Sequence, residues 1–428
     1  MKEKILYFIK KPTSKNIIIN TLGQYLNVFF TAFFAFLLVR IMTPVEYGTL
    51  SVIFGIIYVL ANILDFGTTA SIYSYLPTIF EKKSSHIFSY LKTIFFFQSV
   101  FVIFIMIVFL LSFPYLDKVF FKTNISLIEL YITFFSIIFF IWQNFIFNVY
   151  NATKNFLKSN LYLNFANVIK TIFIVLLIFL GKVNIGLIIF SLGILGPLIV
   201  FLLVILEKKS KIIQILKSPV KKEEFRIKYT LTFFIASQFF NLGQRVDLFL
   251  LSYFLPKSPE LGYYGLAQKI ILTIIAAIVA VTQVLSPSYS KINNKKEVKK
   301  MVKQSLIYLS LPTILFLILS ILPGWVFNLF FTEKYSSTTI ITHLIALSYL
   351  IYPYSHIPLL FLLYTFKKPN KILIVNIIYF FIMTIGCYLT IPILKINGVI
   401  ITIFISFLVI FVLGFFLALE EYQKLPSS

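Results

Sequence analysis

The stretch SYLKTIFFFQSVFVIFIMIVFLLSF, residues 89–113, contains a single charged residue, Lys92. A helix of about 20 apolar residues is long enough to cross roughly 30 Å of hydrocarbon. Similar stretches recur along the whole 428-residue chain, in which 59% of the residues are hydrophobic and 12% are charged. A water-soluble protein of this length would carry far more charge on its surface. The composition therefore identifies a polytopic membrane protein.

Apolar segments of this kind predict membrane-spanning helices rather than strands. An open sheet cannot satisfy its backbone hydrogen bonds in lipid, and the sequence lacks the strict period-two alternation that a transmembrane barrel needs. Twelve spans are predicted, at 17–41, 47–69, 89–113, 125–149, 159–180, 184–205, 229–253, 262–286, 304–328, 338–364, 371–392 and 397–419.

The basic residues predict which segments face the cytoplasm. With the N-terminus inside, 28 of the 38 lysines and arginines fall in inner segments or at the inner ends of spans, 7 fall in outer segments or at the outer ends, and 3 lie deeper within spans. This asymmetry follows the positive-inside rule, so both termini are expected to be cytoplasmic. The net charge of +23 is gathered in short clusters between apolar segments, which argues against nucleic acid as a partner. Contact with anionic membrane lipids is the simpler interpretation.

The chain is predicted to be built from two similar halves. Sliding it by 214 residues superposes QYLN at 24–27 on QFFN at 238–241, and VEYG at 45–48 on PELG at 259–262. Six spans separate the copies, so the halves have the same orientation and a pseudo-twofold axis along the membrane normal, as in some transporters. We expect an N-terminal six-helix bundle over 1–205, a basic cytoplasmic linker over 206–228 and a C-terminal six-helix bundle over 229–428.

Charged residues inside the predicted spans are the first candidates for a functional site. NLGQRVDLFLL, residues 241–251, holds Arg245 and Asp247, and Lys170 and Lys269 fall within other spans. A charge at the bilayer centre costs at least ~2.5–3.5 kcal/mol, so such groups face a bundle interior or a hydrated cavity. Residues two apart on a helix point roughly opposite ways, so Arg245 and Asp247 are each expected to need their own partner or water. Three cations against two acids within the spans favour a cavity for an anion.

Uncharged amides and the two acids extend the set of candidates. Gln238, Asn241 and Arg245 would lie on one stripe of a continuous helix. Amides in such stripes either join helices through hydrogen bonds or line a polar cavity. For the acids, pairing with the cations and carriage of a coupling ion are both open. The amide candidates are Gln24, Asn27, Asn164, Asn167, Gln238 and Asn241, and the acids are Asp65 and Asp247.

Transport is favoured over catalysis. No glycine-rich nucleotide loop or metal-ligand cluster is visible in the sequence, so neither a metal nor a cofactor is expected. A membrane glycosyl polymerase or ligase would be expected to present a sizeable outer loop, and the outer loops are short. His343 and His356 in the tenth span are more simply packing residues, beside Pro353 and Pro358, which should kink that span.

A family resemblance rests on VRIMTPVEYGTLSVIFGIIYVLANILDFGTTASIYSYLP, residues 39–77. This stretch resembles the opening of the bacterial polysaccharide flippases, in which a first helix ending near an Arg is followed by Leu/Met-x-Pro-x-Glu-Tyr-Gly and then an Asp-x-Gly element. QRVDLFLLSYFLPKSPELGYYGLAQKI, residues 244–270, is similar to a recurring Asp-then-Leu-Gly-x-Tyr pattern of that family. The matching residues of the first stretch are Arg40, Pro44, Glu46, Tyr47, Gly48, Asp65 and Gly67.

The resemblance implies an all-α membrane fold like that of the multidrug and toxin exporters, with two like-oriented bundles around a central cleft. It also implies a flippase that moves undecaprenyl-pyrophosphate-linked oligosaccharide repeat units to the outer leaflet of the bacterial cytoplasmic membrane. The glycan would serve a surface polysaccharide such as the O-antigen of lipopolysaccharide. A polysaccharide polymerase and chain-length proteins are expected partners.

On this interpretation the candidates have separate tasks. Arg245 would bind the pyrophosphate, with Lys170 and Lys269 as helpers, because cations hold phosphate. The amides would bind sugar hydroxyls. A cation-coupled multidrug or toxin exporter on the same scaffold is the alternative, and such a protein is expected to favour acids over bases in its cavity.

Overall fold

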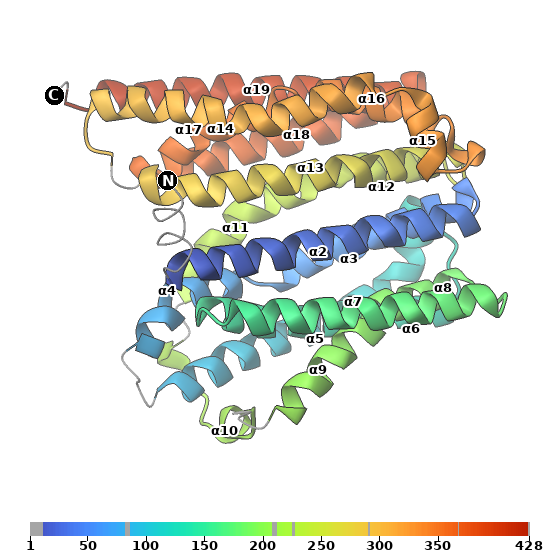
Figure 1. Cartoon of the computed structure of the whole chain (residues 1–428), viewed down its shortest axis with the longest axis horizontal. Coiled ribbons are helices and arrows are strands. Elements are labelled where there is room, and N and C mark those ends of the chain that lie inside the picture. Colours follow the sequence, from blue (N-terminus) through green and yellow to red (C-terminus); the bar gives the residue numbers. More distant parts are fainter. Residues whose placement is uncertain are drawn as a thin grey trace, which may run out of the picture. The chain divides into compact units, whose positions relative to one another are not determined.

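A computed structural model describes residues 12–81, 86–207, 212–224, 227–289, 292–366 and 368–426, and within these residues the chain is helical without a β-strand (Figure 1). The first half contains α2 (Pro12–Ile41), α3 (Pro44–Leu64), α4 (Thr68–Glu81), α5 (Ile87–Leu116), η1 (Asp117–Phe121), α6 (Leu127–Ala152), α7 (Phe156–Phe179), α8 (Ile185–Ile189), η2 (Phe190–Leu195), α9 (Gly196–Leu206), α10 (Ile212–Lys217) and η3 (Lys222–Glu224). The second half contains α11 (Ile227–Gly243), α12 (Val246–Phe254), α13 (Pro259–Tyr289), α14 (Lys295–Ile321), α15 (Gly324–Phe330), η4 (Glu333–Tyr335), α16 (Thr338–Ser348), α17 (Tyr352–Leu360), η5 (Phe361–Thr365), α18 (Pro369–Leu394) and α19 (Ile396–Gln423).

Eleven helical segments of the described chain are long and apolar enough to cross a membrane. They correspond to eleven of the twelve predicted spans, so the predicted all-α membrane fold is confirmed. The remaining prediction, 229–253, covers α11 and α12, which are two shorter helices separated by a turn rather than one continuous span.

Two proline-containing segments show where local chemistry sets the helix ends. The predicted span 304–328 is wrong at its C-terminal end, since α14 covers Lys295–Ile321 and a separate short helix, α15, follows. Pro323 lacks a backbone N–H and disfavours a helical conformation in the residue before it, which ends α14. In the tenth span the predicted kink is confirmed, because α16 ends at Ser348 and α17 begins at Tyr352, directly before Pro353.

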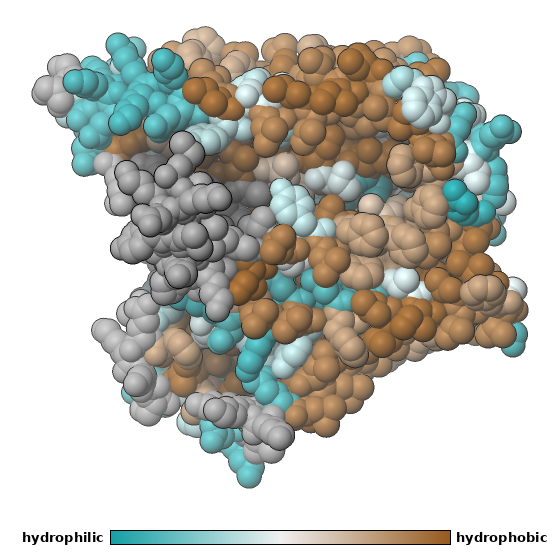
Figure 2. All heavy atoms as spheres, in the orientation of Figure 1, coloured by the Kyte–Doolittle hydropathy of each residue, from teal (hydrophilic) through white to brown (hydrophobic). Residues whose placement is uncertain are grey.

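Lipid-facing surface is visible along individual helices. Along α14 and α19, Figure 2 shows hydrophobic side chains over the middle of the helices and hydrophilic ones where α14 begins and α19 ends. Ile307 on α14 and Phe416 on α19 are among the large apolar side chains that remain exposed. In water such surface would drive association, whereas in a bilayer it contacts hydrocarbon.

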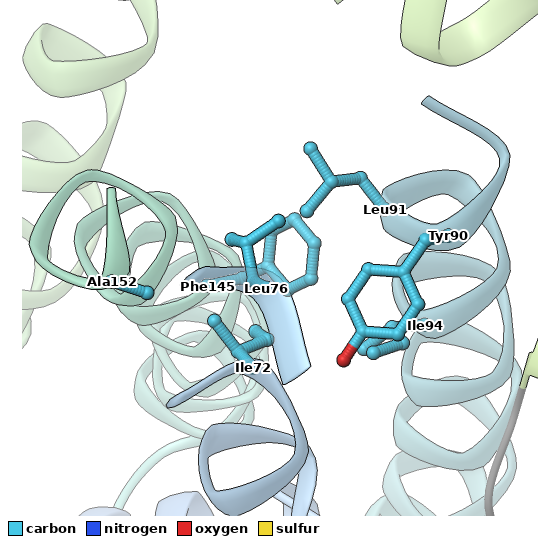
Figure 3. Close-up of a cluster of buried hydrophobic side chains, with 7 residues drawn as sticks. All are labelled: Ile72, Leu76, Tyr90, Leu91, Ile94, Phe145 and Ala152. Atoms are coloured by element: carbon cyan, nitrogen blue, oxygen red, sulfur yellow. The ribbon is translucent and has the colours of Figure 1, made fainter. Parts of the chain in front are cut away.

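The chain forms two compact units. The first comprises the described residues within 1–34, 56–116 and 124–234. One part of its core is a cluster in which α4, α5 and α6 meet (Figure 3). The basic linker reaches the same unit, because the Lys221 backbone N–H donates to the Thr93 hydroxyl of α5 at 2.9 Å. The cluster consists of Ile72, Leu76, Tyr90, Leu91, Ile94, Phe145 and Ala152.

The second compact unit comprises the described residues within 35–55, 117–123 and 235–428. In it α13, α14 and α16 pack together, and α17 and α18 each pack against α19 (Figure 1). The end of α2 and the start of α3 therefore pack with second-half helices. These two units are defined by packing. The expected bundles 1–205 and 229–428, with the linker 206–228, were defined by counting spans, so the division into these bundles stays a prediction.

Within the second unit, α3 and α13 approach at backbone distance through residues that the 214-residue repeat makes equivalent. A Cβ added to Gly48 would lie 2.8 Å from the backbone N of Gly262, which is its repeat equivalent. A Cβ added to Gly265 would lie 2.4 Å from the hydroxyl of Ser51, again its equivalent. In a twofold arrangement equivalent residues meet each other only at the axis. These contacts therefore support the predicted internal repeat and its pseudo-twofold axis.

Candidate functional site

The turn between α11 and α12 positions Arg245. α11 ends at Gly243, and Arg245 is the N-cap residue of α12, with φ −131° and ψ −10°. Gly243 is needed there because a Cβ would lie 2.7 Å from the ring of Tyr379. The expectation that Gln238, Asn241 and Arg245 share one stripe of a continuous helix is therefore wrong, since the helix is interrupted before Arg245.

Gln268 joins Arg245 to Asp247. The Arg245 guanidinium Nη1 donates to Gln268 Oε1 at 2.7 Å, and Gln268 Nε2 donates to Asp247 Oδ2 at 3.1 Å. Asp247 also accepts from the Leu248 backbone N–H at 2.7 Å and from the Tyr264 hydroxyl. Asp247 thus has partners of its own, as expected, and the Gln268 amide in addition bonds to both charged side chains.

Burial explains why this network is fully bonded around the carboxylate. Asp247 is 3% exposed and Gln268 is 8% exposed, so neither can rely on water. A buried carboxylate is tolerated only when hydrogen bonds replace its hydration. Tyr264 and Gln268 lie four residues apart on α13 and so present their polar atoms to Asp247 from one helix face.

Lys269 adds a second cation to this network. It follows Gln268 on α13, is half-buried, and lies near enough to Arg245 for their positive charges to repel. Its ammonium forms no hydrogen bond or ion pair with any residue that the structure describes. Asp247 is largely committed to Tyr264, Gln268 and Leu248, so positive charge dominates the Arg245–Lys269 side of the site.

Gln238 and Asn241 lie on α11, before the turn. Both side chains are half-buried. Gln238 Nε2 donates to the Ser237 hydroxyl at 3.3 Å. Asn241 makes no hydrogen bond to another described side chain or carbonyl. They belong to the same compact unit as Arg245 and Lys269.

Lys170 belongs to the other compact unit. Its side chain passes Gly196 of α9, where an added Cβ would lie 2.9 Å from Lys170 Cδ, and its Nζ lies 5.5 Å from the centre of the Phe34 ring. It is half-buried and has no acidic partner among residues 12–81, 86–207 and 212–224. A cation over an aromatic face gains some electrostatic attraction, which offsets part of the cost of its burial.

Lys158, on the same helix, is different because its charge is neutralised. Its ammonium pairs with Glu207, which also accepts hydrogen bonds from Tyr150 at 3.0 Å and from Tyr162 at 3.4 Å. Burial opposes ionisation of Glu207, but the hydrogen bonds and charge of Lys158, together with the two tyrosines, outweigh it and lower the pKa of that carboxyl. Of the two lysines, only Lys170 can offer its charge to a ligand.

The asparagines of α7 bond to α2. Asn167 Nδ2 donates to Asn27 Oδ1 at 2.9 Å, and Asn164 Nδ2 donates to the Gly23 carbonyl at 3.1 Å. One turn earlier, Asn160 Nδ2 donates to Asn20 Oδ1 at 3.2 Å. The structure therefore contains the hydrogen bonds between helices that were one of the two interpretations of these amides. Binding of sugar by these amides stays a prediction.

Gln24 and Asp65 have different surroundings. The Gln24 side chain is exposed. Asp65 directly follows α3, and its carboxylate accepts from the hydroxyls of Thr68 at 3.1 Å and Thr69 at 2.6 Å, at the start of α4. Phe66 and Gly67 have φ values of 50° and 70°, so the Asp-x-Gly element forms the turn between these helices. The partners of Asp65 in the described chain are thus threonines rather than lysines or arginines.

Gln268 and Tyr264 are the residues that sequence reasoning missed. Both stand in the quoted stretch 244–270, and Gln268 directly precedes Lys269. A polar pair four residues apart in an apolar span is the signal that would have found them. No group of three or more His, Cys, Asp or Glu side chains gathers within the described ranges.

The eleven apolar helices define a multi-pass membrane protein, whose second compact unit holds a buried, partly cationic network. Residues 13–293 match the family described as polysaccharide biosynthesis protein. The chain belongs to this family, since the match covers more than half of it. No curated protein matches the sequence.

Solved structures show which fold the chain shares. A multidrug resistance MATE family transporter of the MOP superfamily, in an inward-facing conformation, has a TM-score of 0.70 at 13% identity, covering 96% of this chain and 98% of that chain. The lipid II flippase MurJ, in an inward closed conformation, has a TM-score of 0.71 at 15% identity, covering 95% and 89%. A MOP superfamily transporter from Pyrococcus furiosus, described as having a binding pocket of reverse polarity, has a TM-score of 0.64 at 13% identity, covering 95% and 94%. The fold is therefore that of the MOP superfamily transporters.

Proposed function

We propose that this protein is a flippase for undecaprenyl-pyrophosphate-linked oligosaccharide repeat units, moving them from the inner to the outer leaflet of the bacterial cytoplasmic membrane. Membership of a polysaccharide biosynthesis family supports a glycan substrate. The fold shared with a lipid II flippase supports transport of a lipid-linked substrate rather than catalysis. Surface polysaccharide, including the O-antigen of lipopolysaccharide, is the proposed destination.

The observation that carries the proposal is the pair of cations, Arg245 and Lys269, inside the membrane-spanning part of one compact unit. A guanidinium presents a planar fork of N–H donors that matches phosphate oxygens. Gln268 fixes the direction of the Arg245 side chain through its 2.7 Å hydrogen bond. The ammonium of Lys269, which bonds to no described residue, supplies a second charge. Lys170 is a proposed further contact, and the amides of Gln24, Asn27, Asn164, Asn167, Gln238 and Asn241 are proposed contacts for sugar hydroxyls.

Outward movement of the substrate is favoured by the membrane potential. A negative cytoplasm lowers the free energy of an anion that leaves it by ~2.3 kcal/mol per charge per 100 mV. Alternating access by two six-helix bundles would let the head group cross while the polyprenyl tail stays in lipid. Asp65 and Asp247 are the proposed positions for a coupling ion, although the threonine partners of Asp65 favour a structural role for it.

Location and partners follow from the same proposal. The lysine distribution supports cytoplasmic positions for both termini. A polysaccharide polymerase and chain-length proteins would receive the repeat units on the outer side. No nucleic acid is involved.

A cation-coupled multidrug or toxin exporter is the second candidate. The fold shared with a multidrug resistance transporter favours it. A cavity for cationic drugs would be expected to expose acids, whereas Asp247 is buried beneath three hydrogen-bond donors and Lys269 is not neutralised. The balance of charge therefore supports the flippase.

Replacement of the two cations tests the proposal. Arg245→Ala and Lys269→Ala should each reduce surface glycan at least tenfold, with accumulation of lipid-linked saccharide on the inner leaflet, because each removes a charge-assisted contact worth about 1.5–3 kcal/mol. Surface glycan and the lipid-linked pool are measured in cells in which the variant replaces the native protein. Lys182→Ala, at an exposed lysine between α7 and α8, is the matched control and should behave as the native protein.

Membrane insertion of each variant is checked by immunoblotting of the membrane fraction. Persistence of surface glycan in both variants, together with increased sensitivity to cationic drugs, would replace the flippase with the exporter.

A further inference from the structure

The second compact unit also contains a groove whose lining residues differ from those of the Arg245 network. It has a volume of about 890 Å³ and lies between α14, α17 and α19. Its walls are almost entirely apolar, and no residue of α11, α12 or α13 lines it. Leu306, Leu408 and Phe415 line it while remaining exposed, so the groove opens on the outer surface of these helices.

One end of the groove is polar and basic. Lys299 of α14 and Tyr422 of α19 line this end, where Figure 2 shows hydrophilic side chains over the start of α14 and the end of α19. Lys295 lies over the Tyr422 ring, 5.7 Å from its centre. A phosphate at this end would thus meet an ammonium and a phenolic hydroxyl.

The acids near this end are already engaged. Glu297 Oε2 accepts from the backbone N–H of Asn293 at 2.9 Å. Glu420 and Glu421 form ion pairs with Lys371 at 2.7 Å and with Lys424 at 3.2 and 3.0 Å. Lys299 has no acidic partner among the residues that the structure describes. Charge complementarity at the mouth of the groove therefore favours an anion.

The length of the groove limits the chain that fits it. Its lining on α19 runs from Leu408 to Tyr422. At 1.5 Å per residue this is about 21 Å, which compares with about 15 Å for the hydrocarbon of one leaflet, half of a core of ~30 Å. The groove accommodates a chain that ends within its own leaflet, and a much longer polyprenyl chain would extend beyond it.

We propose that this groove binds an anionic glycerophospholipid, with an acyl chain between α14, α17 and α19 and the phosphate at Lys299 and Tyr422. Basic sites between membrane helices on the cytoplasmic side hold anionic lipid head groups, and the lysine distribution predicts that the start of α14 is on that side. The site goes beyond the flippase function, since it holds a resident lipid rather than the transported one.

Fluorescence quenching by brominated lipids tests the site in the full-length protein. The two native tryptophans are replaced, Trp142→Phe and Trp325→Phe, and a reporter is placed in the groove with Val302→Trp. The protein is reconstituted into phosphatidylcholine vesicles containing brominated phosphatidylglycerol or brominated phosphatidylcholine. The groove should bind phosphatidylglycerol about fivefold more tightly, the contribution of one lysine near a membrane surface.

Matched variants assign that preference to the proposed contacts. Lys299→Gln should abolish it, whereas Lys300→Gln, which removes a neighbouring exposed lysine that does not line the groove, should leave it. A reporter at Ile314→Trp, exposed on α14 outside the groove, should show no preference. If Val302→Trp does not fold, Leu306→Trp takes its place.

Equal binding of the two brominated lipids, or a preference that survives Lys299→Gln, would overturn the site. Displacement of brominated phosphatidylglycerol by equimolar undecaprenyl phosphate would assign the groove to the transported lipid instead. Because the readout is lipid contact, failure here leaves the glycan measurements on Arg245 and Lys269 unaffected.

Discussion

Gln268 decides how the charges at Arg245 and Asp247 are held. A glutamine has both an acceptor and a donor, so one amide can satisfy a guanidinium and a carboxylate at once. It accepts from Arg245 at 2.7 Å and donates to Asp247 at 3.1 Å. A lysine or a carboxylate at this position would repel one of the two. The residue thus stabilises two opposite charges that the helix turn at 244–245 brings to one side of α13.

Gln268→Leu should destabilise the folded protein by about 1–3 kcal/mol, because Asp247 loses one donor and Arg245 loses an acceptor in a buried setting. Thermal unfolding of the purified protein in detergent measures the change. Gln24→Leu, which removes an exposed amide, is the control, and its unfolding midpoint should equal that of the native protein. An unchanged midpoint for Gln268→Leu would show that the amide is dispensable for the network.

The helices α2 and α7 are joined by a row of hydrogen bonds in which residue numbers increase in the same direction along both helices. Asn20, Gly23 and Asn27 of α2 meet Asn160, Asn164 and Asn167 of α7 in that order. Partners that increase together mean parallel helices, which agrees with their positions as the first and fifth spans. Hydrogen bonds between membrane helices contribute modestly, about 0.6 kcal/mol on average and ~1.7 at most.

A double-mutant cycle on Asn27 and Asn167 separates the two interpretations of these amides. If they join helices, Asn27→Leu and Asn167→Leu should show a coupling of about 0.6–1.7 kcal/mol in unfolding, with surface glycan preserved. Unfolding in denaturant and surface glycan are measured for the two single variants and the double variant. Zero coupling with loss of glycan would favour sugar binding instead.

At the scale of the molecule, glycines that the predicted internal repeat makes equivalent lie against each other. Gly48 and Gly262 are 214 residues apart, and their helices approach so closely that neither accepts a Cβ. Nearby, the Tyr335 hydroxyl donates to the Met42 carbonyl at 3.3 Å, which ties the end of α2 to η4. Segments from the first half are therefore built into the second compact unit by backbone proximity.

Gly262→Ala should destabilise the protein by about 1–3 kcal/mol, the usual cost of forcing an extra group into a packed contact. The new Cβ would lie 1.9 Å from the Pro44 carbonyl oxygen, which is backbone and cannot rotate away. Gly324→Ala is the control, since its nearest neighbour would be Thr339 at 3.8 Å. Both variants are compared by thermal unfolding in detergent, and equal midpoints would contradict the close approach of α3 and α13.

The sequence by itself determined the membrane class and located the eleven described helical segments that are long and apolar enough to cross a membrane. Hydropathy and backbone hydrogen bonding within a helix depend on consecutive residues, and lipid leaves a spanning segment no other partner for its backbone. Pro353 likewise predicted the kink between α16 and α17, because proline lacks the backbone N–H that a continuous helix needs. The candidate cations could also be found from the sequence, because a charged residue is easily recognised within an apolar segment of about 20 residues.

Only the tertiary structure decided what those residues touch. Arg245 and Gln268 are separated by 23 residues, and Asn27 and Asn167 by 140. At Gly243, the last residue of α11, the ring of Tyr379 leaves no room for a side chain. Contacts of this kind arise when helices that are far apart in the sequence pack together. The local pattern of a sequence does not tell which helices become neighbours.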